Sequence, residues 1–165
     1  MRVAILTVSD ACARGERADG SGDALAAWAE TRGYAVSART TVPDESERIA
    51  ATLAAWCDED SAELVLSTGG TGLSPRDVTP EATRAVLDRE APGIAERLRA
   101  AVADRFPRAA LSRGIAGVRS RTLIVNLPGS TGGVRDGLTV LDGLVDHAVA
   151  ILRDVPTDHS SGGAG

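Results

Sequence analysis

The sequence predicts an α/β fold, a three-layer sandwich with a mostly parallel sheet and one antiparallel edge. Short apolar segments rich in β-branched residues alternate with amphipathic helical segments, which is typical of a parallel sheet covered on both faces. Residues 115–118 and 122–127 are two further apolar segments separated by only three residues, which predicts an antiparallel hairpin. From the length of 165 residues we expect one domain over residues 1–155 and a disordered polar tail over residues 156–165.

The first half of the chain contains three predicted strands. Residues 3–8 and 64–66 are short, apolar and rich in Val, Leu and Ile, as buried strands are. Residues 34–42 form the second strand along the chain, between a glycine and a proline, and residues 64–66 form the third. A polar, glycine-containing loop is expected over residues 9–22.

Two helices connect these strands. The first is expected from residue 23 to about residue 33, and the second begins at residues 43–45. In the second helix Ile49, Leu53 and Trp56 recur at helical spacing and form one apolar face. Two tryptophans lie on the apolar faces of these helices and are expected in the core, namely Trp28 and Trp56.

The second half begins with a strong helix start. Thr79 is the expected N-cap, Pro80 takes the first helical position and Glu81 places an acid in the first turn. A further helix ends at residues 106–107, where proline follows phenylalanine. The predicted hairpin comes next, and it supplies the antiparallel edge of the sheet.

The last helix is expected to open at residues 128–130 and to run unbroken until just before Pro156. It is apolar over two adjacent ridges, which leaves two interpretations of equal weight. Either another subunit buries part of it, or the helix is wedged deeply into its own domain. The first ridge comprises Val134, Leu138, Leu141, Val145, Ala148 and Leu152, and the second comprises Val140, Leu144 and Ile151.

The composition excludes several classes of function. All 18 basic residues are arginines, so no lysine can serve a P-loop, a Schiff base or general-base catalysis. The net charge is −5 without a basic run, so we expect no nucleic-acid partner. No signal peptide and no apolar run of about 18 residues is present, so we expect no membrane partner. Cys12 and Cys57 are too few for a disulfide framework and indicate a cytoplasmic protein.

A glycine-rich loop follows the third predicted strand. Three glycines in four positions allow positive φ angles and a close approach of the backbone to a ligand. Exposed amides and threonine hydroxyls would then bind an anion without a positive side chain. The alternative is a tight strand-to-helix connection, but this density of glycine and threonine favours ligand binding. The loop contains Thr68, Gly69, Gly70, Thr71 and Gly72.

A second loop of this kind follows the last strand. It contains Pro128, Gly129 and Ser130, and either Ser130 or Thr131 would cap the last helix. The free amides at that helix N-terminus would face an anion in the cleft. Taken alone, the segment could equally be a good helix cap, but two such loops in one small domain favour a phosphate-bearing ligand.

Three aspartates lie close to these loops in the predicted fold. Asp10 follows the first strand and faces the same edge of the sheet. Asp44 and Glu47 form a capping-box pattern, so spacing alone favours a capping role for Asp44. Asp77 is not placed to cap a helix that begins at Thr79, which makes it a candidate for magnesium or substrate contact.

Several segments resemble the molybdenum cofactor biosynthesis family, which includes molybdopterin adenylyltransferases and MoaB-type homologues. The resemblance extends from residue 3 to about residue 153, and its most specific part is the block from the glycine-rich loop to the next helix. The matching motifs are T-V-S-D at 7–10, D-x-S-G at 19–22, T-G-G-T-G-L-S-P-R-D-V-T-P at 68–80, P-G at 92–93, L-S-R at 111–113 and N-L-P-G-S at 126–130.

The resemblance implies a reaction that joins molybdopterin to ATP with Mg²⁺ and releases pyrophosphate. The catalytic aspartates of the family fall on Asp44 and Asp77, which would also hold the metal and so reverse the capping interpretation. The resemblance also implies a homo-oligomer, trimer or hexamer, and a downstream molybdate-insertion protein as a partner. The alternative is an inactive pterin-binding or scaffold protein of the same fold. The implied substrate-binding residues are Ser9, Asp10, Thr68, Gly69, Gly70, Thr71, Gly72, Ser112, Pro128, Gly129 and Ser130.

Overall fold

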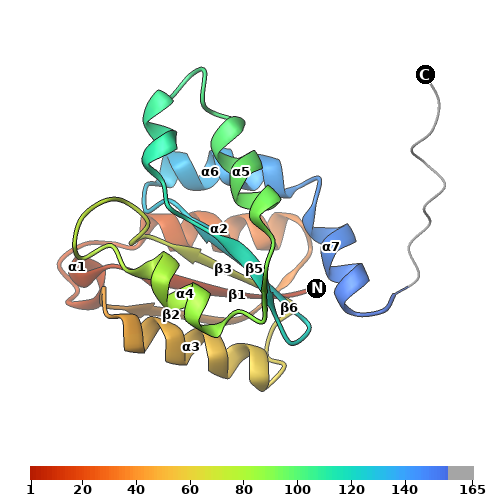
Figure 1. Ribbon diagram of the computed structural model, residues 1–165. Helices are drawn as coiled ribbons and strands as arrows, with labels where there is room; N and C mark the ends of the chain where they lie inside the picture. Colours follow the sequence, from red (N-terminus) through yellow and green to blue (C-terminus); the bar gives the residue numbers. More distant parts are fainter. Residues whose placement is uncertain (156–165) are drawn as a thin grey trace.

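The computed structural model describes residues 1–155, so the tail expected over residues 156–165 lies outside the described residues. It contains one six-stranded sheet with the order β2-β1-β3-β6-β5-β4 (Figure 1). β2, β1, β3 and β6 are parallel, whereas β5 pairs antiparallel with β6 and with β4. The predicted α/β fold with an antiparallel edge is therefore confirmed. The strands are β1 Arg2–Val8, β2 Ala35–Val42, β3 Leu64–Thr68, β4 Arg89–Glu90, β5 Ala116–Arg119 and β6 Thr122–Leu127.

Helices cover both faces of the sheet and make the outer layers of the sandwich (Figure 1). α3 and α4 cover one face, and α2, α6 and α7 cover the other. α5 packs beside α6, and the chain from α5 to the short 3-10 helix η1 extends beyond the sheet. The helices are α1 Asp10–Ala13, α2 Gly20–Thr31, α3 Ser46–Asp58, α4 Thr79–Val86, α5 Pro92–Ala100, η1 Pro107–Leu111, α6 Thr131–Leu141 and α7 Val145–Leu152.

Two apolar cores lie on the two faces of the sheet. Because successive side chains of a strand point to opposite faces, Val3 and Ile5 of β1 contribute to one core. Ala4 and Leu6 of the same strand contribute to the other. Because both faces of the sheet are covered, the strands lie in the middle of the molecule. The loops that follow their carboxyl ends lie at one edge of the sheet.

The loop expected over residues 9–22 contains two helix starts that the sequence prediction missed. α1 is a single turn whose N-cap is Ser9, and the Ser9 hydroxyl accepts a bond from the Cys12 amide. α2 begins at Gly20, three residues earlier than expected, because Asp19 caps it. The Asp19 Oδ1 atom accepts the Gly22 N–H at 2.8 Å.

The two tryptophans expected in the core lie at its rim instead. Trp28 and Trp56 are both half-buried and pack against the edges of the two cores. The Trp28 indole N–H donates to Asp142 Oδ1 at 2.8 Å, a polar contact that a fully buried indole could not make with an exposed carboxylate.

The last helix is broken, which corrects the expectation of one unbroken helix. α6 ends at Leu141 and α7 starts at Val145, because Gly143 weakens the helix and polar contacts hold the break. In addition to the Trp28 contact, the Tyr34 hydroxyl donates to Asp146 at 2.6 Å.

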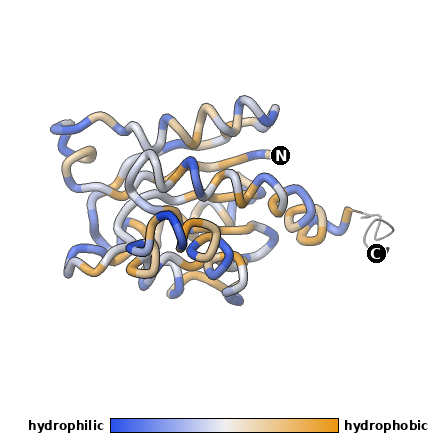
Figure 2. The backbone as a smooth tube through the Cα atoms, turned by 90° about the horizontal axis from the view of Figure 1, so that it is seen from above, coloured by the Kyte–Doolittle hydropathy of each residue, from blue (hydrophilic) through white to orange (hydrophobic). Residues whose placement is uncertain are grey.

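The break rotates the apolar face of the helix. Val149 is buried in α7, whereas Ala148 and Leu152 of the expected first ridge are only half-buried. On the second ridge, Ile151 is 54% exposed, and Figure 2 shows α7 as a strongly hydrophobic segment next to the end of the described chain. None of the described helices is both long and apolar enough to cross a membrane.

Candidate active site

Four loops meet where the parallel strands end, at the left side of Figure 1. Val8 of β1 is aligned with Val42 of β2, and Thr68 of β3 is aligned with Leu127 of β6. The residues that follow these strands therefore leave the sheet side by side, as in other open α/β sheets that bind ligands at this edge. They are the predicted site residues Ser9 and Asp10 after β1, Asp44 after β2, Gly69–Gly72 after β3 and Pro128–Ser130 after β6.

The glycine-rich loop crosses the end of β1 in direct contact with its backbone. Gly69 has a φ of +98°, and a Cβ atom there would lie only 2.2 Å from the carbonyl oxygen of Val8. Gly70 has a φ of +64°, and a Cβ atom there would lie 2.3 Å from the hydroxyl of Thr79 and 3.1 Å from Asp44 Oδ1. Only glycine fits these two positions.

Two buried threonine hydroxyls hold the glycine-rich loop in place through hydrogen bonds to backbone carbonyls. The Thr68 hydroxyl donates to the Pro128 carbonyl at 2.7 Å and so ties the β3 loop to the β6 loop. Thr79 was expected to cap α4, which is wrong, because its hydroxyl donates to the Gly69 carbonyl at 2.9 Å and the N-cap is Val78. Both side chains are fully buried, so these bonds have no competition from water.

Asp44 and Asp10 hold each other through reciprocal bonds. The Asp10 amide donates to Asp44 Oδ2 at 2.9 Å, and the Asp44 amide donates to Asp10 Oδ1 at 3.0 Å. α3 begins at Ser46 with Glu45 at its N-cap, so the capping interpretation of Asp44 is wrong. Asp10 is also paired with Arg76, whose Nη2 atom lies 2.8 Å from its Oδ2 atom.

The two carboxyl groups differ in acidity. Burial raises the pKa of Asp44, and the negative charges of Asp10 and Asp77 raise it further, against the bond from the Asp10 amide. The bond from the Asp44 amide lowers the pKa of Asp10, and Arg76 lowers it further. Asp44 therefore has two other carboxylates near it, and the charge of Arg76 only partly offsets their effect on its pKa.

Asp77 closes a tight turn within the loop. Its Oδ2 atom accepts the Ser74 N–H at 2.8 Å, and its own amide donates to the Ser74 carbonyl at 2.9 Å. A Cβ atom at Gly72 would lie 2.9 Å from the same Oδ2 atom, so the carboxylate is packed against the glycine backbone. Within residues 1–155, neither Asp44 nor Asp77 forms an ion pair.

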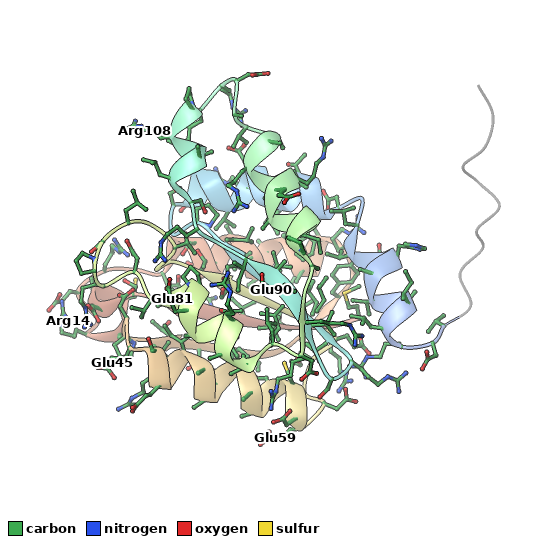
Figure 3. All side chains as sticks on the ribbon, viewed as in Figure 1. Arg14, Glu45, Glu59, Glu81, Glu90 and Arg108 are labelled. Carbon is green, nitrogen blue, oxygen red and sulfur yellow. The ribbon has the colours of Figure 1, made fainter. Side chains whose placement is uncertain are left out.

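The sequence prediction of the site missed Arg113, although this residue closes the L-S-R motif. Its Nε atom donates to the Gly72 carbonyl at 2.7 Å, and its Nη2 atom donates to the Asp77 carbonyl at 2.5 Å. Its guanidinium also pairs with Glu81 on α4, the residue labelled beside that helix in Figure 3. Its amide donates to the Thr71 carbonyl at 2.8 Å.

A cavity of about 750 Å³ lies between these loops and the chain from α5 to η1. One wall is apolar and comes from the chain between the start of α5 and the end of η1, including Leu98, Val102 and Phe106. The opposite wall is the backbone of the two glycine-rich loops. The predicted site residues that line it are Gly70, Thr71, Gly72, Asp77, Ser112, Pro128, Gly129 and Ser130.

The other predicted residues lie outside this cavity. Asp44 lines a smaller neighbouring cavity of about 410 Å³ together with Arg76. Ser9, Asp10, Thr68 and Gly69 line neither of the two cavities.

Three arginines line the main cavity. Arg99 donates to the carbonyls of Ser112 and Gly114, and Arg105 pairs with Asp136 at 2.7 Å. Arg108, labelled on η1 in Figure 3, lies over the ring of Phe106 at 5.3 Å. Within the described part of the chain Arg108 forms no ion pair, which leaves its charge available to an anion.

The cavity also contains a helix N-terminus. Ser130 is the N-cap of α6, and its hydroxyl accepts the Gly133 N–H at 3.1 Å, so Ser130 and not Thr131 is the cap. Among residues 1–155, no group of three or more His, Cys, Asp or Glu side chains gathers as a metal site. A metal at this site would therefore need substrate oxygens to complete its coordination.

Comparisons with known proteins give one consistent result. The family model described as "Probable molybdopterin binding domain" matches residues 4–147. The molybdopterin adenylyltransferase of Escherichia coli is 40% identical over 141 residues, which cover 84% of this chain and 72% of that protein. The molybdenum cofactor synthesis protein cinnamon of Drosophila melanogaster is 39% identical over 91% of this chain and 25% of its own length.

Solved structures agree in fold. The molybdopterin biosynthesis enzyme MoaB of Thermus thermophilus superposes with a TM-score of 0.88 and 48% identity, covering 94% of this chain and 98% of that one. The chain spans less than half the length of several curated relatives that it matches.

Proposed function

The chain belongs to the family of the "Probable molybdopterin binding domain" in molybdenum cofactor biosynthesis, and we propose that it is a molybdopterin adenylyltransferase. It transfers AMP from ATP to the terminal phosphate of molybdopterin and releases pyrophosphate. We assign the activity to residues 1–155 as one domain. The observation that carries the proposal is the main cavity, where an apolar wall faces two glycine-rich loops and the Asp77 carboxylate.

The walls of the cavity suit a ligand with an apolar ring and phosphate groups. The wall formed by Leu98, Val102 and Phe106 offers contact area to the planar ring of a pterin. The amides of the glycine loops and of the α6 N-terminus are donors for phosphate oxygens. Arg108 supplies a positive charge at the same cavity.

The reaction needs no strong general base. The terminal phosphate of molybdopterin has a second pKa of about 6 and is largely dianionic at neutral pH. One of its oxygens attacks the α-phosphorus of ATP, and the bond from that phosphorus to the oxygen shared with the β-phosphate breaks. Pyrophosphate leaves with the electron pair. The protein contributes alignment and charge stabilisation, which fits a chain without lysine.

The donor set at the loops fits magnesium. Mg²⁺ is commonly held by one or two carboxylates together with substrate phosphates, and Asp44 and Asp77 are two carboxylates without a cationic partner in residues 1–155. When bound, the ion would neutralise charge on the phosphates. Asp44 and Asp77 would hold it, and the carboxylate charge near Asp44 already favours a cation there.

Replacing Asp44 by Asn is expected to separate activity from stability. The pKa of Asp44 is raised above its ordinary value of 3.8 in the folded protein, so folding favours the protonated form. The ionised carboxylate therefore costs stability at neutral pH, and this cost disappears as the pH falls through the raised pKa. Asn still accepts the Asp10 amide, so we expect an equal or higher melting temperature at pH 7 and a turnover lower by about tenfold or more.

The control is the same comparison in acid, where wild type and Asp44→Asn should converge in melting temperature. A marked loss of stability at pH 7 with full turnover would contradict the role in catalysis.

The proposed function is tested by pyrophosphate release. Wild-type protein with ATP and Mg²⁺ should release pyrophosphate only when molybdopterin is added, in proportion to the molybdopterin supplied. Release that is independent of molybdopterin would indicate a different nucleotide reaction, and no release would contradict the proposal.

We further propose a homo-oligomer, a trimer or a hexamer, that works in the cytoplasm and delivers its product to a molybdate-insertion protein. The free thiols of Cys12 and Cys57 suit a reducing compartment. Ile151 on α7 and Val155 just after it are each 54% exposed and would be buried by another copy.

Light scattering of the wild-type protein should give a mass that is a multiple of three chains. Ile151→Glu should give smaller species that remain folded, because an exposed side chain contributes little to its own core. A monomeric wild type would contradict the assembly, and an Ile151→Glu variant of unchanged mass would place the interface elsewhere.

A further inference from the structure

We propose that Arg113 is a positioning residue of the reaction, which holds the Asp77 loop in its working conformation. The inference rests on the proposed function and concerns a residue that contacts neither of the two cavities. Its basis is the set of contacts that join the end of η1 to the glycine-rich loop.

The exposed part of the Asp77 loop has no apolar anchor, whereas Val78 at its end packs against the core on the α3 side of the sheet. Residues 73–76 are exposed, and Leu73 retains 65% of its accessible surface. Burial of side chains therefore cannot fix residues 73–76, which precede Asp77. Polar contacts must do so, and they determine where the Asp77 carboxylate lies.

Two arginines hold the loop from opposite sides. Arg76, within the loop, reaches Asp10 at the start of α1, but this pair is largely exposed on the arginine side. Exposed ion pairs of this kind contribute little. Arg113 approaches from η1 and is more enclosed, with 35% of its side chain exposed.

Arg113 uses its planar guanidinium to bind three groups at once. Nε reaches the Gly72 carbonyl, Nη2 reaches the Asp77 carbonyl, and the Glu81 carboxylate anchors the outer edge. The contacts are on both sides of the turn that Asp77 closes with Ser74. The three donors of a lysine ammonium all lie on one nitrogen, so a lysine cannot span acceptors that Arg113 reaches with three separate nitrogens.

The same residue joins the loop to the cavity wall. Arg113 follows Ser112, which lines the main cavity, and its own amide donates to the Thr71 carbonyl at 2.8 Å. Hydrogen bonds of Arg113 therefore join the wall from η1 to the loop that carries Asp77. A shift of the loop by about 1 Å can lower turnover by about 100-fold.

The test is Arg113→Lys, measured alone and together with Asp77→Asn. We expect turnover to fall by about 100-fold while molybdopterin affinity, measured without ATP, stays within about twofold. Because Arg113 acts through Asp77, adding Arg113→Lys to Asp77→Asn should lower turnover by less than about twofold. The matched control is Arg84→Lys, since Arg84 pairs with Glu90 away from the site.

A second readout does not depend on activity. Hydrogen exchange at the amides of Ser74 and Asp77 should be faster in Arg113→Lys than in wild type, with exchange in α3 unchanged. If the wild type shows no adenylyl transfer, the proposed function fails. The exchange result still tests whether Arg113 holds the Asp77 loop in place. If Arg113→Lys does not fold, Glu81→Gln serves the same test, because it removes the carboxylate that anchors the guanidinium. Three results would each overturn the proposal. They are full turnover of Arg113→Lys, an equal loss of turnover when Arg113→Lys is added to the wild type and to Asp77→Asn, and unchanged hydrogen exchange at the Ser74 and Asp77 amides.

Discussion

Replacing Asp77 by Asn is expected to lower adenylyl transfer by about 100-fold or more, with molybdopterin affinity unchanged. The substitution removes one negative charge and preserves the size of the side chain. The amide oxygen of Asn can still accept the Ser74 N–H that Asp77 accepts at 2.8 Å. The turn should therefore persist, and the lost activity would report the missing charge at the phosphates.

Asp88→Asn is the matched control for this result. Asp88 also accepts a backbone N–H, from Ser120 at 2.6 Å, but it lies outside both cavities. Its substitution should leave turnover unchanged. Asp77→Asn turnover within a few-fold of the wild-type value would remove Asp77 from the charge-stabilising role.

Gly69→Ala is expected to have the largest effect on stability. The new methyl group would lie 2.2 Å from the Val8 carbonyl oxygen, and the residue would keep a φ of +98°. The strain of a positive φ costs about 1–3 kcal/mol, and the displacement of β1 backbone adds an overpacking cost of about 1–3 kcal/mol. Urea unfolding should show a midpoint well below that of the wild type.

Gly33→Ala separates the two costs. Gly33 has a φ of +70°, but nothing lies within 4 Å of a Cβ atom there. This variant should lose about 1 kcal/mol, from backbone strain alone. If Gly69→Ala is no less stable than Gly33→Ala, the loop can move away from β1, and the close contact that defines the site is not required.

The sheet and its site edge could be predicted because their signals are local. The apolar segments that end at Val8, Leu66 and Leu127 each run directly into polar or glycine-rich residues. Parallel strands then bring those loops together whatever the helices do. For this reason the glycine loops and Asp77 were predicted at one edge of the sheet, whereas only the family resemblance added Asp44 to the site. The structure places these residues around two neighbouring cavities.

The features that were missed depend on contacts between distant residues. The break before α7 is held by Trp28 and Tyr34, more than 100 residues away in the sequence. Thr79 had the local pattern of an N-cap, but its hydroxyl binds Gly69, which folding brings beside it. Arg113 binds carbonyls 36 and 41 residues away in the sequence. The spacing of residues within a motif cannot predict contacts over such separations.

The wall of the main cavity was missed for a similar reason. Phe106 and Leu111 are 50% and 51% exposed, so neither belongs to the periodic pattern of a buried helix face. They line the cavity only because the chain from α5 to η1 extends over the loops. The sequence prediction treated this segment as the end of a helix and assigned it no role in the site.

The most direct test of the proposed activity is the mass of the product. Molybdopterin, ATP and Mg²⁺ incubated with the protein should give adenylylated molybdopterin, with one pyrophosphate released for each AMP transferred. The same mixture with Asp77→Asn should give almost none. Molybdopterin that binds to the wild-type protein but is recovered unmodified would contradict the account and leave a pterin-binding protein without this activity.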